Sequence, residues 1–183
     1  MVKTSKTKYI APFETDELRK CLSAFFDTPY QSDLGHTRPI GSFKWGAYIF
    51  YDYDGEPIYV GQTKERVSGR IGRHLTNQRT DAVAMSVLDP FEVFEIEVYP
   101  LPQFEDVKAR NPDNSKNPDY QHAKAYLDAL EYWVHGKAIR ESKFRAILNE
   151  KDPPTPTMPI DPPRPLRGQI VSDDVANCAA TRM

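Results

Sequence analysis

The stretch WGAYIFYDYDGEPIYVG, residues 45–61, decides the fold of this chain. Two runs rich in aromatic and β-branched residues flank Asp54-Gly55, and an Asp-Gly pair between such runs is a strong signal for a β-hairpin. We therefore predict two antiparallel strands joined at this pair. A two-residue turn gives three facing pairs: Tyr53 with Glu56, Phe50 with Tyr59, and Tyr48 with Gly61.

This register brings two tyrosines to one face of the hairpin. Tyr48 and Tyr59 become diagonal neighbours, close enough for two phenols to act at one point. Gly61 has no side chain, so the register predicts room opposite Tyr48 for a phosphate or a backbone. Tyrosines are also ordinary strand residues, so the pair alone does not identify a site.

A helix is predicted after the hairpin, over about residues 63–77. Val67, Ile71 and Leu75 repeat every four residues and would face the core. Arg70 and His74 lie one turn apart on the adjoining arc. A guanidinium suits a phosphate because its planar fork binds two oxygens and keeps its charge. His74 would orient water, bind phosphate or pack in the core.

The rest of the pattern predicts one more strand and further helices. Phe91–Val98 alternates as a strand, residues 119–136 carry a helical stripe, and a shorter helix or turn follows over 139–149. Residues 15–26 have helical spacing with Thr15 as N-cap. We predict an α+β fold, with a small three-stranded antiparallel sheet flanked by helices.

The ends of the chain differ from its middle. We predict an N-terminal extension over residues 1–44, which contains the helix at 15–26. A core follows over 45–151, with an inserted loop at 100–118, and a Pro-rich tail covers 152–183. Seven prolines between residues 153 and 165 predict that the tail is extended and partly flexible.

Charge is distributed unevenly along the chain. The net charge of -2 does not indicate a nucleic-acid partner. Residues 64–79, however, hold five cations and one anion, and residues 137–151 hold five cations and two anions. These segments would form a local track for phosphates, or they would be solvated helix faces.

The composition also bears on the compartment. Cys21 and Cys178 lie far apart with no CxxC or Cys/His cluster, which argues against a zinc site and for a reducing, cytoplasmic location. No stretch approaches the roughly 18 apolar residues of a membrane span, and no signal peptide is evident. We expect a soluble protein.

Five motifs, taken in order, resemble those of the GIY-YIG nuclease superfamily. They are Gly46-Ala47-Tyr48, Tyr59-Val60-Gly61 after ten intervening residues, Arg70 and His74 in RIGRHL, Glu131 in LEYW, and Asn149 in ILNE. The resemblance covers about residues 45–149. Ala47 and Val60 stand where isoleucine is usual. The family carboxylate is assigned to Glu131 rather than Glu141 from its helix context.

The resemblance implies hydrolysis of a phosphodiester in a site with one Mg²⁺ or Mn²⁺ ion. Tyr48 would activate water with help from His74, Tyr59 would hydrogen-bond the phosphate or the nucleophile, and Arg70 would stabilise the transition state. Glu131 would hold the metal. Asn149 would tie its segment to the site or contact the phosphate.

DNA contacts are assigned to separate residues. Gly61, Lys64, Arg66 and Arg73 would lie along flanking phosphates without reading sequence. Candidates for base reading are the segment at 36–44, which includes His36, and the asparagines of the 100–118 loop, which are Asn111, Asn114 and Asn117.

The sequence thus predicts a metal-dependent DNA endonuclease, site-specific and of restriction type, acting on double-stranded DNA. A restriction enzyme of this kind would commonly form a homodimer. Two alternatives stay open. One is a repair or mobile-element nuclease that a partner protein targets, and the other is an inactive nucleic-acid-binding module of the same fold.

Overall fold

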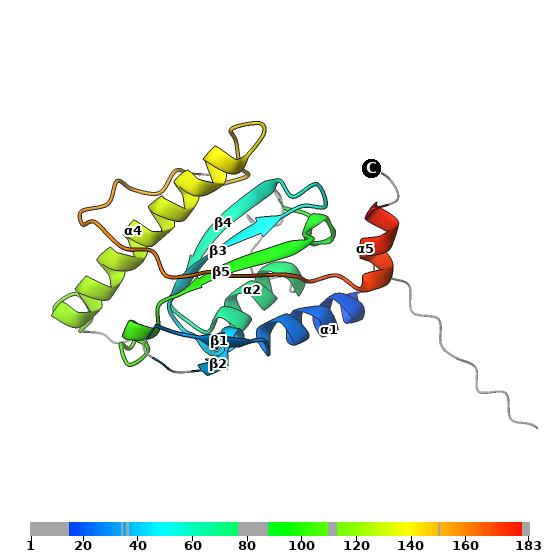
Figure 1. The fold of residues 1–183 in the computed structure, drawn as a ribbon. Coiled ribbons are helices and arrows are strands. Elements are labelled where there is room, and N and C mark those ends of the chain that lie inside the picture. The colour runs from blue at the N-terminus through cyan, green and yellow to red at the C-terminus, as the bar shows by residue number, and fades with distance from the viewer. Residues whose placement is uncertain are drawn as a thin grey trace, which may run out of the picture.

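The computed structural model of the chain describes residues 15–33, 35, 37–76, 88–109, 113–149 and 151–180. An antiparallel sheet runs through the middle of the molecule (Figure 1). Helices α1 (Thr15–Phe26) and α2 (Val67–Thr76) cover one face, and α4 (Pro118–Glu141) covers the other. The α+β class predicted from the sequence is confirmed.

Within the described residues, the central sheet has four strands in the order β4-β3-β5-β6. These are β3 (Gly46–Tyr51), β4 (Pro57–Thr63), β5 (Glu95–Pro100) and β6 (Leu166–Gln169). The predicted number of three was wrong because β6 comes from the Pro-rich tail. The prolines stop at Pro165, so the next four residues have N–H groups to pair with β5.

A separate two-stranded ribbon consists of β1 (Pro29–Gln31) and β2 (Thr37–Pro39). Strands of three residues are too short to show alternation in sequence, so this ribbon was not predicted. Tyr30 is the buried residue of β1, and its hydroxyl donates to the Arg164 carbonyl at 2.7 Å. The ribbon therefore helps to hold the tail.

The hairpin has the predicted register at the end away from its turn. Tyr48 pairs with Gly61 and Phe50 with Tyr59. The two-residue turn was wrong, as was the facing of Tyr53 and Glu56: the register shifts at Tyr51, which pairs with Pro57.

A three-residue loop replaces that turn. The Asp52 carboxylate accepts from the N–H groups of Asp54 and Glu56, at 2.9 and 2.8 Å. Gly55 has φ 73°, which glycine adopts without strain.

The helices differ from prediction mainly at their ends. α1 has the predicted bounds, whereas α2 begins at Val67 because Thr63 extends β4. α4 reaches Glu141 as one helix, and the described residues 142–149 contain no further helix. The remaining elements are η1 (Ile40–Ser42), η2 (Pro90–Glu92), η3 (Pro102–Phe104) and α5 (Asp173–Ala180).

Alternation along β3 divides the core between the two faces of the sheet. Tyr48 and Phe50 pack with α1 and α2. Ala47, Ile49 and Tyr51 pack with α4. At the edge of the sheet, β4 packs against α4 on one face, and on the other face its Tyr59 ring contacts His74 of α2.

The loop and the tail are packed where the structure describes them. Glu105 in the loop accepts from the Lys44 N–H at 2.7 Å and forms an ion pair with Arg38 at 3.3 Å. In the tail, the Asp161 carbonyl accepts from the Tyr126 hydroxyl of α4 at 2.9 Å. Boundaries at residues 44/45 and 151/152 remain predictions.

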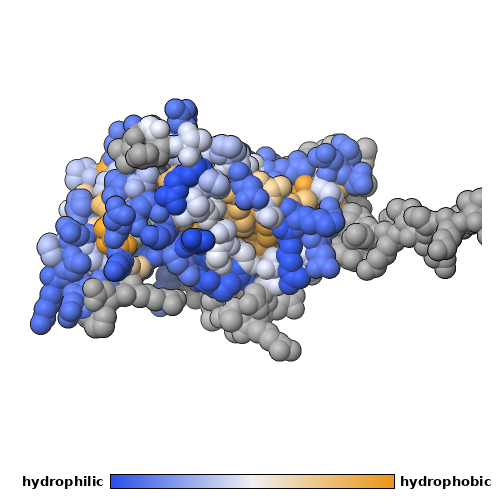
Figure 2. Space-filling model, turned by 90° about the horizontal axis from the view of Figure 1, so that it is seen from below, coloured by the Kyte–Doolittle hydropathy of each residue, from blue (hydrophilic) through white to orange (hydrophobic). Residues whose placement is uncertain are grey.

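Charged and apolar side chains share the surface. Figure 2, a view from the side of α1 and the β1–β2 ribbon, shows a mostly hydrophilic face with an apolar area near its middle. None of the described helices has the length and apolar character needed to cross a membrane.

Candidate active site

Tyr48 lies at the centre of the candidate site, buried on β3. Its phenol passes over Gly61 so closely that a Cβ at residue 61 would lie 2.6 Å from the Tyr48 ring and hydroxyl. The space expected there for a phosphate is thus filled by the phenol itself. A glycine at residue 61 is therefore required for the Tyr48 side chain to take this position, even without substrate.

An aromatic cluster surrounds this phenol. The His74 imidazole lies with its ring centre 6.2 Å from Tyr48 and 5.7 Å from Tyr59, and Phe50 stacks on Tyr59 at 5.6 Å. His74 is 4% exposed, in the last turn of α2. Packing is therefore one role of His74, while its roles toward water or phosphate stay predictions.

Three other residues of the predicted site change the pKa of the Tyr48 hydroxyl. Burial raises the pKa of Tyr48 well above its ordinary value, and Tyr59 and Glu131 raise it further, while Arg70 lowers it. Among the described residues this hydroxyl has no hydrogen bond of standard geometry, although the Arg70 guanidinium is close enough to interact with it. Groups from β4, α2 and α4 thus act on one oxygen.

A hollow of about 410 Å³ opens beside Arg70. Its lining residues come mainly from the end of β4 and the turn into α2: Gln62, Thr63, Lys64, Glu65, Arg70 and Ala109. Arg70 therefore lies between the buried phenol and an open surface that can admit the phosphates of a nucleic acid.

Glu131 lies on α4, which covers the other face of the sheet, and it contacts Gln62 of β4. The Gln62 amide donates to the Glu131 carboxylate at 2.9 Å and lies 3.5 Å from Asp128. Burial, and then the Asp128 charge, raise the pKa of Glu131 to about 7, against smaller effects of Gln62 and Lys124. Lys124 forms its ion pair with Asp128.

This environment fits a divalent cation. In the part of the chain that the structure describes, no ion pair includes Glu131, and no group of three or more His, Cys, Asp or Glu side chains could enclose a metal. A partly buried carboxylate next to a second one gains from a cation. Mg²⁺ keeps most of its water and needs few protein ligands.

Glu141 occupies a different environment. It accepts from the Tyr51 hydroxyl and from Lys137, both at 3.1 Å. Ten residues of helix separate it from Glu131, about 15 Å along α4. Its surroundings therefore favour Glu131 as the metal ligand.

Asn149 is tied to the β4 backbone. Its side-chain oxygen accepts from the Val60 N–H at 3.0 Å, and its amide donates to the Val60 carbonyl at 2.8 Å. The N–H of Leu148 also donates to the Ile58 carbonyl at 2.8 Å. Of the two predicted roles, tying its segment to the site is the one the geometry supports.

The residues predicted to contact phosphates differ in their exposure and in their ion pairs. Lys64 lines the hollow, with its ammonium 3.4 Å from the Tyr120 hydroxyl, and Arg66 is exposed at the start of α2. Arg73 forms an ion pair with Glu65, which offsets its charge. Arg79 lies outside the described residues.

Two of the predicted base readers serve the fold. The Asn114 amide donates to the carbonyls of Lys108 and Ala109, at 3.2 and 2.8 Å. Asn117 is the N-cap of α4. Both side chains are therefore engaged internally, while Asn111 and His36 lie outside the described residues.

Two neighbours of Glu131 were missed from the sequence. Gln62 alternates with Gly61 and so faces α4, and Asp128 lies one helical turn before Glu131. Both positions were available from strand and helix periodicity, once Glu131 had been placed beside β4.

The comparisons with known proteins agree with this geometry. Residues 44–104 match a family model described as the GIY-YIG catalytic domain, a range that includes Tyr48, Tyr59, Arg70 and His74. Glu131 and Asn149 lie beyond it. Searches of curated proteins and of solved structures gave no match. Through residues 44–104, about a third of its length, the chain is similar to the catalytic domain of GIY-YIG nucleases.

Proposed function

We propose that this protein is a divalent-metal-dependent DNA endonuclease that hydrolyses phosphodiester bonds. The observation that carries the proposal is the convergence on the Tyr48 hydroxyl. The Tyr59 ring of β4 has its centre 6.4 Å from that of Tyr48, and Arg70 from α2 and Glu131 from α4 lie near enough for their charges to act on the same hydroxyl. The match to a catalytic domain supports a nuclease in general.

Arg70 is assigned to the scissile phosphate. It lines the hollow and lies beside Tyr48, so a phosphate bound there would be close to both residues. Its fixed charge would stabilise the charge that builds up on the phosphate oxygens. Removing a contact of this type costs about 3 kcal/mol, or roughly a hundredfold in rate.

Tyr48 is assigned to the attacking water. Its raised pKa keeps the phenol neutral at pH 7, so it would relay a proton unless its pKa falls. Arg70 already lowers that pKa, and a cation on Glu131 would cancel the opposing carboxylate charge. When bound, the divalent ion would also neutralise charge on the leaving 3′ oxygen.

We further propose a cytoplasmic restriction-type enzyme that cuts double-stranded DNA as a homodimer. The core carries added segments at its start, middle and end, and no second DNA-binding motif was found in the sequence. Targeting by a partner protein and an inactive binding module are the alternatives. The deep burial of Tyr48 is the observation that favours the inactive module.

Plasmid cleavage in Mg²⁺ tests the proposal. Wild type should cut, Glu131→Ala should be inert, and Glu141→Ala should cut if it remains folded. Activity lost only in Glu141→Ala would reassign the metal ligand. Discrete fragments would support intrinsic site specificity, and random nicking would favour targeting by a partner. A wild type that binds DNA without cutting would favour the inactive module.

A further inference from the structure

The turn after α4 displays an aromatic side chain between two cations. Phe144 is 80% exposed, and the flanking Lys143 and Arg145 are also exposed. Its ring forgoes the free energy that burial in a core would give. The turn belongs to the basic segment 137–151, whose charges the candidate active site does not use.

This turn is held in one shape by its own hydrogen bonds. Ser142, 2% exposed, accepts from the N–H groups of Phe144 and Ala146 at 3.2 and 3.3 Å, and donates to the Ala146 carbonyl at 3.1 Å. Arg145 has φ 55°, a left-handed conformation that costs energy in a non-glycine residue. The display of Phe144 is thus built into the backbone.

The hairpin fixes the turn from the other side. The buried Glu56 carboxylate accepts from the Lys143 N–H at 3.0 Å. Burial would raise the pKa of Glu56, but hydrogen bonds from Ser142, Lys143 and Phe144 outweigh it and lower the pKa. The carboxylate therefore stays ionised and anchors the turn at neutral pH.

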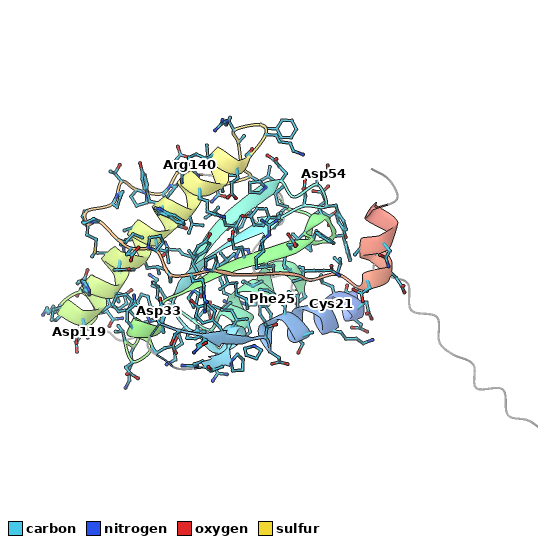
Figure 3. All side chains as sticks on the ribbon, in the orientation of Figure 1. Cys21, Phe25, Asp33, Asp54, Asp119 and Arg140 are labelled. Atoms are coloured by element: carbon cyan, nitrogen blue, oxygen red, sulfur yellow. The ribbon has the colours of Figure 1, made fainter. Side chains whose placement is uncertain are left out.

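The turn lies along the same sheet edge as the active site. After it, Leu148 and Asn149 bond to Ile58 and Val60 of β4. From Glu56, just before β4, to Gly61 the chain covers roughly 17 Å at about 3.3 Å per residue, or some five nucleotides of duplex at about 3.4 Å each. In Figure 3, Arg140 near the end of α4 and Asp54 at the hairpin tip lie at the same end of the molecule.

We propose that Lys143, Phe144 and Arg145 form a second DNA contact, about five nucleotides from the cut. The two cations hold phosphates of the flanking duplex, and the Phe144 ring enters a groove against the base edges. This contact rests on the proposed DNA substrate. A single ring between cations matches a polyanion with apolar base edges better than it matches an apolar protein surface.

Other groups of the basic segment divide between the fold and this contact. Lys137 forms ion pairs with Glu97 and Glu141, at 2.8 and 3.1 Å. Arg145 uses one donor on the Arg140 carbonyl at 3.4 Å, which leaves most of its five N–H groups for phosphate oxygens. Lys143 and Arg145 are the two cations that flank the Phe144 ring.

Duplex binding by fluorescence anisotropy, in EDTA to prevent cutting, tests the contact. Phe144→Ala should weaken binding about tenfold, because the contact of the ring with the groove is lost, while Phe144→Tyr should retain it. Phe91→Ala is the matched control, since Phe91 is 39% exposed on η2. It should bind as wild type does.

The salt dependence of the same binding tests the two cations. Lys143→Ala and Arg145→Asn should each reduce the slope of log affinity against log salt by about 0.9. Asparagine is chosen at residue 145 because it tolerates a positive φ. Unchanged slopes in both variants would remove the cations from the contact.

Plasmid cutting by the wild type separates this contact from the nuclease proposal. If wild type cuts and Phe144→Ala binds as tightly as Phe91→Ala, the contact is refuted and the nuclease stands. If binding depends on Phe144 but wild type is inert, the contact stands and the nuclease fails. A wild type without measurable affinity for duplex refutes the contact whatever it cuts.

Discussion

At the scale of single residues, the position of the Tyr48 ring depends on the glycine at residue 61, because the phenol occupies the space that a side chain there would fill. Gly61→Ala should displace the Tyr48 ring and lower the cutting rate at least tenfold. Overpacking of this kind costs about 1–3 kcal/mol of stability. Plasmid cutting and thermal denaturation measure the two effects.

Gly72 offers a matched control on α2. A Cβ there meets nothing within 4 Å, so Gly72→Ala should keep activity and stabilise the helix by about 0.5–1 kcal/mol. Equal activity of Gly61→Ala and Gly72→Ala would mean that the position of the phenol does not matter to catalysis.

Glu131 gives the site a pH dependence. Its pKa of about 7 lies above the usual 4.5, so the folded state binds this proton more tightly than the unfolded state does. The resulting stability is complete below about 4.5 and is lost as the pH rises through about 7. A divalent ion binds the ionised form, so cutting at low Mg²⁺ should rise with pH through about 7.

Rate profiles at two Mg²⁺ concentrations check this expectation. The acidic limb should move to lower pH as Mg²⁺ rises, because the ion competes with the proton for Glu131. An acidic limb that stays at the same pH would show that another group controls it.

At the scale of elements, Asn149 holds the edge strand on which Tyr59 and Gly61 lie. Asn149→Ala would leave the Val60 N–H and carbonyl without this partner, and should cost about 1–3 kcal/mol. Asn149→Asp keeps the acceptor but loses the donor, so an intermediate loss is expected.

Hydrogen exchange at the Val60 amide measures this tie directly. Exchange should be fastest in Asn149→Ala and intermediate in Asn149→Asp. An unchanged rate in Asn149→Ala would mean that β4 is held by its other contacts.

The sequence predicted elements best where the pattern was local. The spacing of Leu18, Leu22 and Phe25 gave the bounds of α1, and Asp54-Gly55 located the hairpin. The three-residue loop was missed because it depends on the Asp52 side chain bonding to the loop backbone. β6 was missed because its partner β5 is distant in sequence and its four residues directly follow the proline-rich run that ends at Pro165.

The candidate site was predictable to the extent that motif order fixes residue types. The family pattern specifies Tyr48, Arg70 and Glu131, and Arg70 and Glu131 both act on the pKa of Tyr48, while their roles in a site stay predictions. The Arg73–Glu65 ion pair and the internal bonds of Asn114 depend on loop conformation, which residue types do not encode. Charge counts along the sequence therefore overstated the free cations around α2.

At the scale of the whole molecule, the tail completes the sheet. Deleting residues 166–183 would expose the edge of β5 and would remove both the ion pair of Arg167 with Glu95 and its contact over the Tyr51 ring. We expect a loss of several kcal/mol and a tendency to aggregate through the open edge. Deleting only 173–183, which removes α5, should cost less.

Thermal denaturation and light scattering compare the two truncations. If both unfold at the temperature of the full chain, β6 contributes nothing to stability. A lower melting temperature for the longer deletion alone would assign the effect to β6.

The position of β6 also bears on how the protein is made. Every motif residue from Tyr48 to Asn149 is synthesised before the strand that borders β5. On the ribosome, the nascent chain therefore carries its whole set of reactive side chains on an unfinished sheet, and pairing across such a long stretch of sequence is slow. Cleavage activity should then appear late, after translation has passed residue 169.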